Sequence, residues 1–229
     1  MKRPVLLDLF CGAGGAGMGY REAGFHIIGM DIADQPHYPG QFIQTDVMKL
    51  RRLDKFCDLI GAVAIHASPP CQRYSDLAKR NRNAEKWPDL IEPTRKMLVA
   101  SGRHYVIENV EGAPLIDPVT LCGSTFPGLR VLRHRLFETS FSLQPRPCHN
   151  RHPLVFTHDK RKAHYGKLDQ NTSFVQVTGG GNCTVANKAD AMGISWMTGK
   201  ELNESIPPRY TRYVGQLLMV HLRESRAAA

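Results

Sequence analysis

Cysteine 71 stands in the segment SPPCQ (residues 68–72), directly after two prolines. A cysteine thiolate is a strong nucleophile that can form a covalent intermediate with a substrate. Each proline ring fixes a backbone torsion, so Pro69 and Pro70 hold the chain stiffly before the thiol. A buried structural cysteine is the commoner role of this residue type. Because the stiff frame follows an apolar run, the pattern favours a positioned nucleophile.

An acid and two arginines could act beside such a nucleophile. Glu108 begins the segment ENV (residues 108–110), directly after the apolar HYVI. An acid at the carboxyl end of a core strand faces the crevice where parallel-sheet enzymes bind ligands. Arg133 and Arg135 lie two apart, so both side chains share one face if the segment is extended. The alternatives are a surface loop glutamate and a solvated basic strand edge.

Glycines at positions 12, 14 and 17 spell GxGxxG directly after an apolar run. Gly12 and Gly14 would let the backbone approach a nucleotide-like ligand closely, an arrangement that NAD enzymes and S-adenosylmethionine (SAM) enzymes share. Asp31 lies about twenty residues further on, where an acid can bind ribose hydroxyls. Asp46 could close a third element and reach an adenine amine. The alternative is a plain tight turn with two surface acids.

The elements that position these residues alternate between strands and helices. We expect strands over residues 4–10, 25–31, 58–67 and 104–108, and helices over 15–24 and 92–101. This alternation predicts an α/β fold with a parallel sheet and right-handed crossovers. A further helical pattern after Pro207 and Pro208 should return to pack on the main domain.

The chain has 229 residues, enough for one sizeable α/β domain with a small appendage. Its net charge of +9 favours a polyanionic partner such as nucleic acid. The six cysteines include no CxxC pair, which indicates reduced thiols. No apolar run is long enough to span a bilayer, and the brief apolar start is too short for a signal peptide. We expect an intracellular, cytoplasmic protein with no membrane partner.

Four segments in fixed order carry a resemblance to one family. They are DLFCGAGGAGMG (8–19), PPCQ (69–72), ENV (108–110) and RHR (133–135). Together they resemble the motifs of the DNA cytosine C5-methyltransferases, and the resemblance covers residues 5–137 well. The ending IPPRYTRYVGQLL (206–218) resembles that of short, phage-type members. The resemblance implies a Rossmann-like SAM-dependent methyltransferase sheet with a small C-terminal target-recognition region. It places the catalytic domain at residues 1–138 and 196–225, and the recognition region at 139–195.

The resemblance also implies a covalent mechanism on double-stranded DNA. Cys71 would add to carbon 6 of cytosine, and Glu108 would protonate ring N3. Arg135 would hold the cytosine O2, with Arg133 supporting the same pocket. Because neither face of the ring is accessible inside a duplex, the base must be flipped out. We expect the protein to act as a monomer.

For SAM, the resemblance implies backbone contacts around Phe10, Gly12 and Gly15. Asp31 would take the ribose and Asp46 the adenine amine, with Pro70 close to the sulfonium. Which C-terminal residues complete this pocket stays open. Gly181–Asn182 is one candidate for the family's Gly-Asn motif.

Two basic stretches lie outside these motifs. The chain after Cys71 carries cations that could meet phosphates as a closing loop: Arg73, Lys79, Arg80, Arg82 and Lys86. A later stretch is rich in zinc-ligand types: Cys148, His149, His152, His158 and His164. Its spacing matches no closed zinc finger and only one cysteine lies nearby, so we expect no metal and a basic DNA-contacting surface instead.

Four rival functions use some of the same residues. A tRNA cytosine C5-methyltransferase would carry the same catalytic groups, and a modified SAM donor would use the same cysteine chemistry. A non-catalytic DNA-binding relative is disfavoured by the intact Cys71, Glu108 and Arg135. An NAD-dependent oxidoreductase would leave the PPCQ, ENV and RHR segments unexplained.

Overall fold

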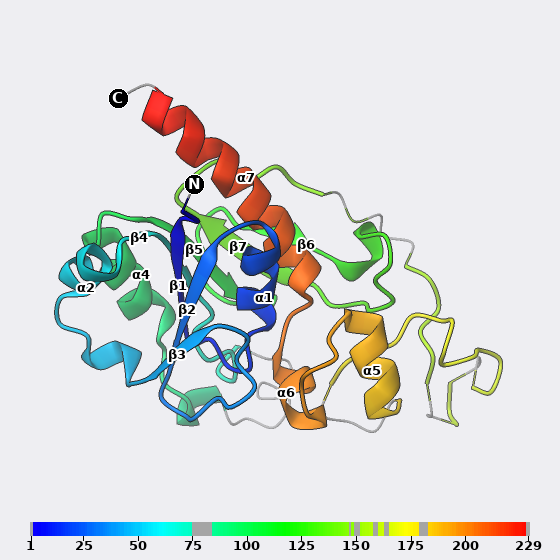
Figure 1. Ribbon diagram of the computed structural model, residues 1–229. Helices are drawn as coiled ribbons and strands as arrows, with labels where there is room; N and C mark the ends of the chain where they lie inside the picture. Colours follow the sequence, from blue (N-terminus) through cyan, green and yellow to red (C-terminus); the bar gives the residue numbers. More distant parts are fainter. Residues whose placement is uncertain are drawn as a thin grey trace.

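A seven-stranded sheet in the order β3-β2-β1-β4-β5-β7-β6 forms the centre of the protein (Figure 1). The computed structural model describes residues 2–74, 84–146, 148, 152–157, 160–162, 165–178 and 183–227. The strands are β1 (Val5–Leu9), β2 (His26–Asp31), β3 (Gln41–Gln44), β4 (Ala62–Ala67), β5 (His104–Asn109), β6 (Val119–Leu121) and β7 (Arg135–Thr139). The pairs among β1 to β5 are parallel, whereas β7 runs antiparallel to β5 and β6. The predicted α/β sheet is confirmed.

Helices cover both faces of this sheet (Figure 1). They are α1 (Gly15–Glu22), α2 (Leu53–Ile60), α4 (Ile91–Ala100), α5 (Val185–Met192), α6 (Gly199–Glu204) and α7 (Pro208–Ala227), with 3-10 turns at Val47–Lys49, Ala84–Lys86 and Gly123–Thr125. Strand side chains alternate between two apolar cores, as a two-residue period requires. Leu6 joins the core with α1 and α7, whereas Leu7 joins the core with α2 and α4.

The end of the chain returns to its beginning, as expected from the sequence. Helix α7 packs along α1, and the Thr211 hydroxyl donates to the Ala16 carbonyl at 2.8 Å. A side chain on Gly19 would collide with the α7 backbone at Pro208, so this glycine permits the close approach. Among the described residues, no helix is long and apolar enough to cross a bilayer.

One predicted strand begins later than expected. Residues 58–60 belong to the end of α2, and the strand starts at Ala62. Gly61 adopts φ 68° and closes the helix, because a residue without Cβ enters the left-handed region easily. Leu59 is 81% exposed, so it lengthens the apolar run without joining the core.

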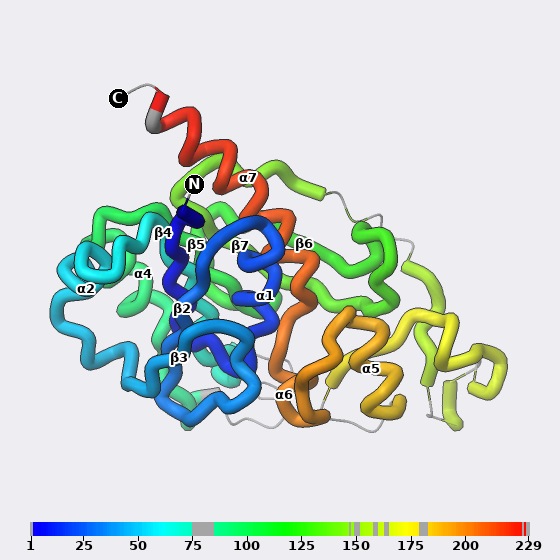
Figure 2. The backbone as a smooth tube through the Cα atoms, viewed as in Figure 1, coloured from blue at the N-terminus to red at the C-terminus, as the bar shows by residue number. Residues whose placement is uncertain are grey.

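The segment after β7, here the chain between β7 and α5, contains no helix or named strand among its described residues and can be followed in Figure 2. Isolated bridges join Val131 to Val175 and Val155 to Phe174. Val175 and Val177 are buried in the same core as α1 and α7. The predicted recognition region is therefore packed onto the sheet through a shared core, and the domain division drawn from the sequence stays a prediction.

Candidate active site

Cys71 lies in the loop that leaves β4, at the carboxyl end of the sheet. The Ser68 amide donates to the Leu9 carbonyl at 3.2 Å, which joins this loop to the end of β1. From the other side, the Asn109 side-chain amide donates to the Pro69 carbonyl at 2.8 Å. The loop is held at both neighbouring strand ends, so the position of the thiol is fixed by backbone contacts and not by the prolines alone.

The thiol faces three charged groups. Burial raises the pKa of Cys71, Arg135 is the strongest opposing influence, and Glu108 and Arg133 also act on it. The resting form is therefore the thiol. Thiolate formation needs the positive charge of Arg135 and Arg133 to outweigh burial and the negative charge of Glu108.

Glu108 is buried at the end of β5, with 6% of its surface exposed. Burial raises its pKa, while Arg135, the Ser68 hydroxyl and Arg133 oppose that rise. The Arg135 Nε lies 3.2 Å from the Glu108 Oε1. A carboxyl group with a raised pKa can hold a proton close to neutral pH, which a proton donor to a ring nitrogen requires.

A buried relay that the sequence did not reveal supports Glu108. His66 is fully buried, and burial lowers its pKa to about 3, so the imidazole is neutral. The Tyr20 hydroxyl lies 3.1 Å from His66 Nδ1, and the Ser68 Oγ lies 2.9 Å from Nε2. If Tyr20 donates to Nδ1, Nε2–H donates to Ser68, and the Ser68 hydroxyl hydrogen is left for Glu108. No spacing pattern in the sequence predicts this contact, because Tyr20 lies on α1 whereas His66 lies on β4 and Ser68 follows it.

The side chains of Arg133 and Arg135 have different partners. Arg135 points at Glu108 and donates to the His134 carbonyl at 2.7 Å. Arg133 is buried and donates to the carbonyls of Val177 at 2.5 Å and Asn203 at 2.8 Å. Burial lowers the pKa of Arg133 to about 9. Arg133 therefore fastens the later chain to the site, while Arg135 is the arginine paired with Glu108.

The turn after β1 brings the predicted cofactor residues together. The Gly12 amide donates to one Asp31 oxygen at 3.0 Å, and the Ala33 amide donates to the other at 3.0 Å. Phe10 and Gly12 adopt positive φ angles of 55° and 47°, and a Cβ on Gly12 would meet no atom within 4 Å. Ile32, directly after Asp31, is 67% exposed. An open backbone turn, an acid with spare acceptor sites and an exposed apolar side chain fit the ribose and adenine of SAM.

Other predicted cofactor residues have structural contacts in the protein itself. Gly14 lacks a side chain where Tyr38 and Pro39 pack, and Gly15 lacks one where Ser205 and Ile206 pack. Asp46 accepts from the Met48 amide at 3.0 Å as the cap of a 3-10 turn. Pro70 stands beside Cys71 and is partly exposed. Gly181–Asn182 lies outside the described residues.

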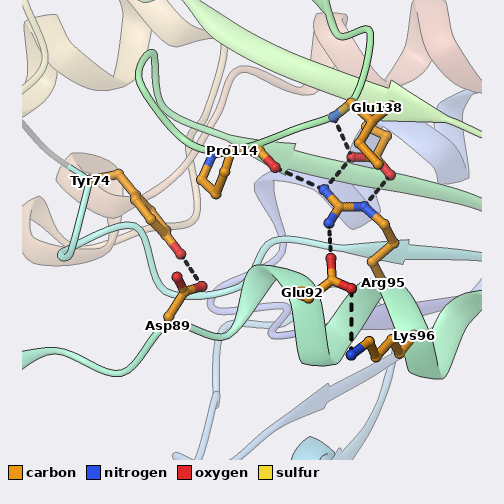
Figure 3. A network of polar contacts seen from close by, with 8 residues as sticks. Tyr74, Asp89, Glu92, Arg95, Lys96, Pro114 and Glu138 are labelled. Atoms are coloured by element: carbon orange, nitrogen blue, oxygen red, sulfur yellow. Dashed lines mark hydrogen bonds and ion pairs between the residues drawn. The ribbon is translucent and has the colours of Figure 1, made fainter.

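Polar contacts behind the site tie α4 to its surroundings (Figure 3). Arg95 donates to both Glu138 oxygens at 2.8 Å, and Glu138 lies on β7, the strand that begins at Arg135. Tyr74 and Asp89 share a short hydrogen bond, which joins the two described stems of the basic loop after Cys71. Of the cations predicted for that loop, Arg73 and Lys86 are described, whereas Lys79, Arg80 and Arg82 fall outside the described residues.

Comparison with known proteins finds one matching family and several similar proteins. Residues 5–115 match the family model of the C-5 cytosine-specific DNA methylases. The type II methyltransferase M.HgiGI of Herpetosiphon aurantiacus is 29% identical over 48% of this chain and 92% of its own length. M.XorII of Xanthomonas oryzae pv. oryzae is 26% identical over 49% of this chain, which spans only 29% of that relative.

A solved structure shares the whole fold. The crystal structure of a putative DNA modification methyltransferase encoded in an Escherichia coli prophage superposes with a TM-score of 0.62. It covers 96% of this chain and 99% of the prophage protein, at 14% sequence identity. The likeness therefore extends past the matched motifs and includes the segment after β7 and helix α7.

Proposed function

Since the chain belongs to the C-5 cytosine-specific DNA methylase family, we propose that it methylates carbon 5 of cytosine in DNA through a covalent Cys71 adduct on a flipped base. SAM, the donor that this family uses, supplies an electrophilic methyl group. The observation that carries the proposal is that Glu108 and Arg135 both act on the Cys71 thiol and contact each other at the carboxyl end of the sheet. A nucleophile, a proton donor and a cation are the groups that this reaction needs.

The chemistry follows from these three side chains. The Cys71 thiolate adds to ring carbon 6, while Glu108 delivers a proton to N3 and Arg135 binds the O2 oxygen. The electron pair gained at carbon 5 would then attack the sulfonium methyl group, so that a carbon–carbon bond forms while the sulfur–methyl bond breaks and the neutral thioether leaves. A base would remove the carbon 5 proton, the returning electron pair would expel the Cys71 thiolate, and N3 would return its proton to Glu108.

The environment of Glu108 matches its role. Its proton goes to N3 at the moment when charge leaves the ring, so the carboxyl must be protonated before the reaction. Burial favours the protonated form, and the Ser68 hydroxyl with Arg135 stabilises the carboxylate that is left behind. Ser68 and His66 are positioning residues because neither needs to touch the cytosine.

Double-stranded DNA is the proposed substrate, and tRNA is the alternative. The net charge of +9 suits either polyanion. A duplex requires base flipping, whereas a single-stranded RNA loop already presents an accessible base. The family model and the names of the relatives favour DNA. A role within a restriction–modification pair, in the prokaryotic or phage-infected cytoplasm, is proposed from those names.

Nucleoside mass spectrometry tests this proposal most directly. DNA, and separately tRNA, would be incubated with the protein and SAM, beside Cys71→Ala as the control. We expect 5-methylcytosine in DNA with the native protein and none with the variant, while SAM binding by the variant persists in calorimetry. Product from the Cys71→Ala variant would overturn the nucleophile, and product in tRNA alone would overturn the substrate.

A further inference from the structure

A cluster of four sulfur and nitrogen ligands lies beside the active site. Cys122, His134, Cys148 and His152 each direct one such atom to the same point, and these four atoms lie within 4.8 Å of one another. Cys122 follows β6 and His134 precedes β7, while Cys148 and His152 belong to the later His-rich stretch. The cluster therefore joins two separate parts of the chain.

The distances fit a tetrahedral metal. Zinc binds sulfur at about 2.3 Å and imidazole nitrogen at about 2.1 Å, so ligand atoms around it stand roughly 3.4–3.8 Å apart. The Cys148 Sγ lies 3.5 Å from the His134 Nε2, and the Cys122 Sγ lies 3.8 Å from the His152 Nε2. The Cys148 Sγ to His152 Nε2 distance is 2.7 Å, so this pair must open by about 1 Å.

The neighbours of the four residues suit a metal as well. The Glu111 carboxylate lies 3.5 Å from the His134 Nδ1, the ring nitrogen that points away from the cluster. A carboxylate in this position orients a ligating histidine and makes it more basic. The Ser124 hydroxyl lies 3.1 Å from the Cys122 Sγ and 3.8 Å from the Cys148 Sγ, where it can donate to thiolates.

The chain around the cluster is held firmly in place. Cys122 is buried, and its carbonyl accepts from the Thr125 hydroxyl at 2.8 Å. Arg146, two residues before Cys148, donates to the Thr125 carbonyl at 2.7 Å, and its guanidinium lies 4.6 Å from the Phe126 ring centre. Both sides of the site are thus positioned by contacts that do not use the four ligand atoms themselves.

We propose that Cys122, His134, Cys148 and His152 form a structural zinc site that fastens the segment after β7 to the catalytic strands. Two cysteines and two histidines are a donor set typical of closed zinc sites, in which four protein ligands leave no position for substrate. His134 stands between Arg133 and Arg135, and Glu111 follows the ENV segment. The zinc would therefore brace the strand ends that carry Glu108 and Arg135.

A zinc site differs from the expectation of no metal in the sequence analysis. The spacing of Cys148, His152 and their neighbours matches no finger because the other two ligands lie earlier in the chain, at positions 122 and 134. His149, His158 and His164 lie outside the described residues.

Metal analysis of tag-free protein tests the site. Elemental mass spectrometry should find about one zinc per chain, lost in Cys148→Ser and in His152→Ala. Cys71→Ser is the matched control: it removes a thiol at the crevice and should keep its zinc. Zinc absent from the native protein after growth with added zinc, or retained in full by both ligand variants, would overturn the proposal.

A second measurement needs no variant. Replacing zinc by cobalt(II) should give the visible bands of a tetrahedral ion and a near-ultraviolet sulfur-to-cobalt transition, because two ligands are thiolates. An octahedral spectrum without a sulfur transition would overturn the proposal even if the ligand variants failed to fold. Both readouts are independent of methyl transfer, so a failure of the zinc site and a failure of the proposed activity are separable.

Discussion

The crevice at the strand ends and the segment after β7 are held in place by different means. In the crevice, the loop of Cys71 is tied to the ends of β1 and β5 by hydrogen bonds to backbone carbonyls of Leu9 and Pro69. The later segment is joined by isolated backbone bridges such as Val131 to Val175, and buried cations add further bonds. Arg133 donates to Val177 and Asn203, and Lys188 donates to the Thr178 carbonyl at 2.8 Å.

This contrast shows where each region is vulnerable. A strand-end loop keeps its shape when one side chain is lost, because neighbouring backbone bonds remain. In the later segment one cation makes more than one of the joining bonds, so its loss removes several at once, and each buried carbonyl left without a donor costs free energy. We therefore expect side-chain substitutions to affect chemistry in the crevice and folding in the later segment.

The two arginines of the RHR segment sharpen this contrast most. Arg133→Ala should lower the free energy of unfolding by about 3 kcal/mol, because two buried carbonyls lose a charged donor. Arg135→Ala should reduce kcat/KM for methyl transfer by about 100-fold or more. It should change the free energy of unfolding less than Arg133→Ala does, because Glu108 can stay protonated and uncharged when its partner is removed. Urea denaturation and steady-state kinetics of both variants test this. Equal losses of stability in the two variants would contradict the expectation that Arg133 supports folding and Arg135 supports the chemistry.

Asp8, on β1 beneath the glycine turn, makes the stability of the sheet region depend on pH. Burial raises the pKa of Asp8 to about 8, with the Tyr38 hydroxyl opposing the rise and Asp31 adding to it. The folded state then holds a proton that the unfolded state has lost, so stability falls as pH rises toward 8.

The slope should be at most about 1.4 kcal/mol per pH unit. Between about pH 7 and 8, His66 is mainly neutral in both states, because its unfolded pKa is about 6.5, and its contribution is the same in the native protein and an Asp8 variant. Thermal denaturation without SAM should show a shallower slope for Asp8→Asn than for the native protein over this range. Parallel slopes would show that Asp8 ionises normally in the fold.

Ser68 gives the smallest and most specific effect. Ser68→Ala removes the hydroxyl that favours the Glu108 carboxylate, so the pKa of Glu108 should rise further. We expect kcat to fall up to about tenfold and the alkaline limb of the pH–rate profile, where Glu108 loses its proton, to move to higher pH. An unchanged profile with a lower kcat would mean that Ser68 supports only the loop.

Much of the fold could be predicted from the sequence, because local patterns encode it. The strand predicted over residues 4–10 is observed at Val5–Leu9, and Asp31 ends the next strand as the pattern predicts. The early part of the 58–67 run was wrong because an exposed Leu59 at the end of α2 looks like a core residue in the sequence. The roles of Cys71, Glu108 and Arg135 came from a resemblance and stay predictions.

The residue types available can be read along the chain: a proline-framed cysteine, an acid ending an apolar run and a pair of arginines. Which of them come into contact depends on how the whole chain packs. The relay from Tyr20 through His66 to Ser68 and the four-ligand cluster around His134 both join residues far apart along the chain. The physical reason is that such contacts depend on strand order, register and loop path, which follow from the packing of the whole chain and leave no local pattern.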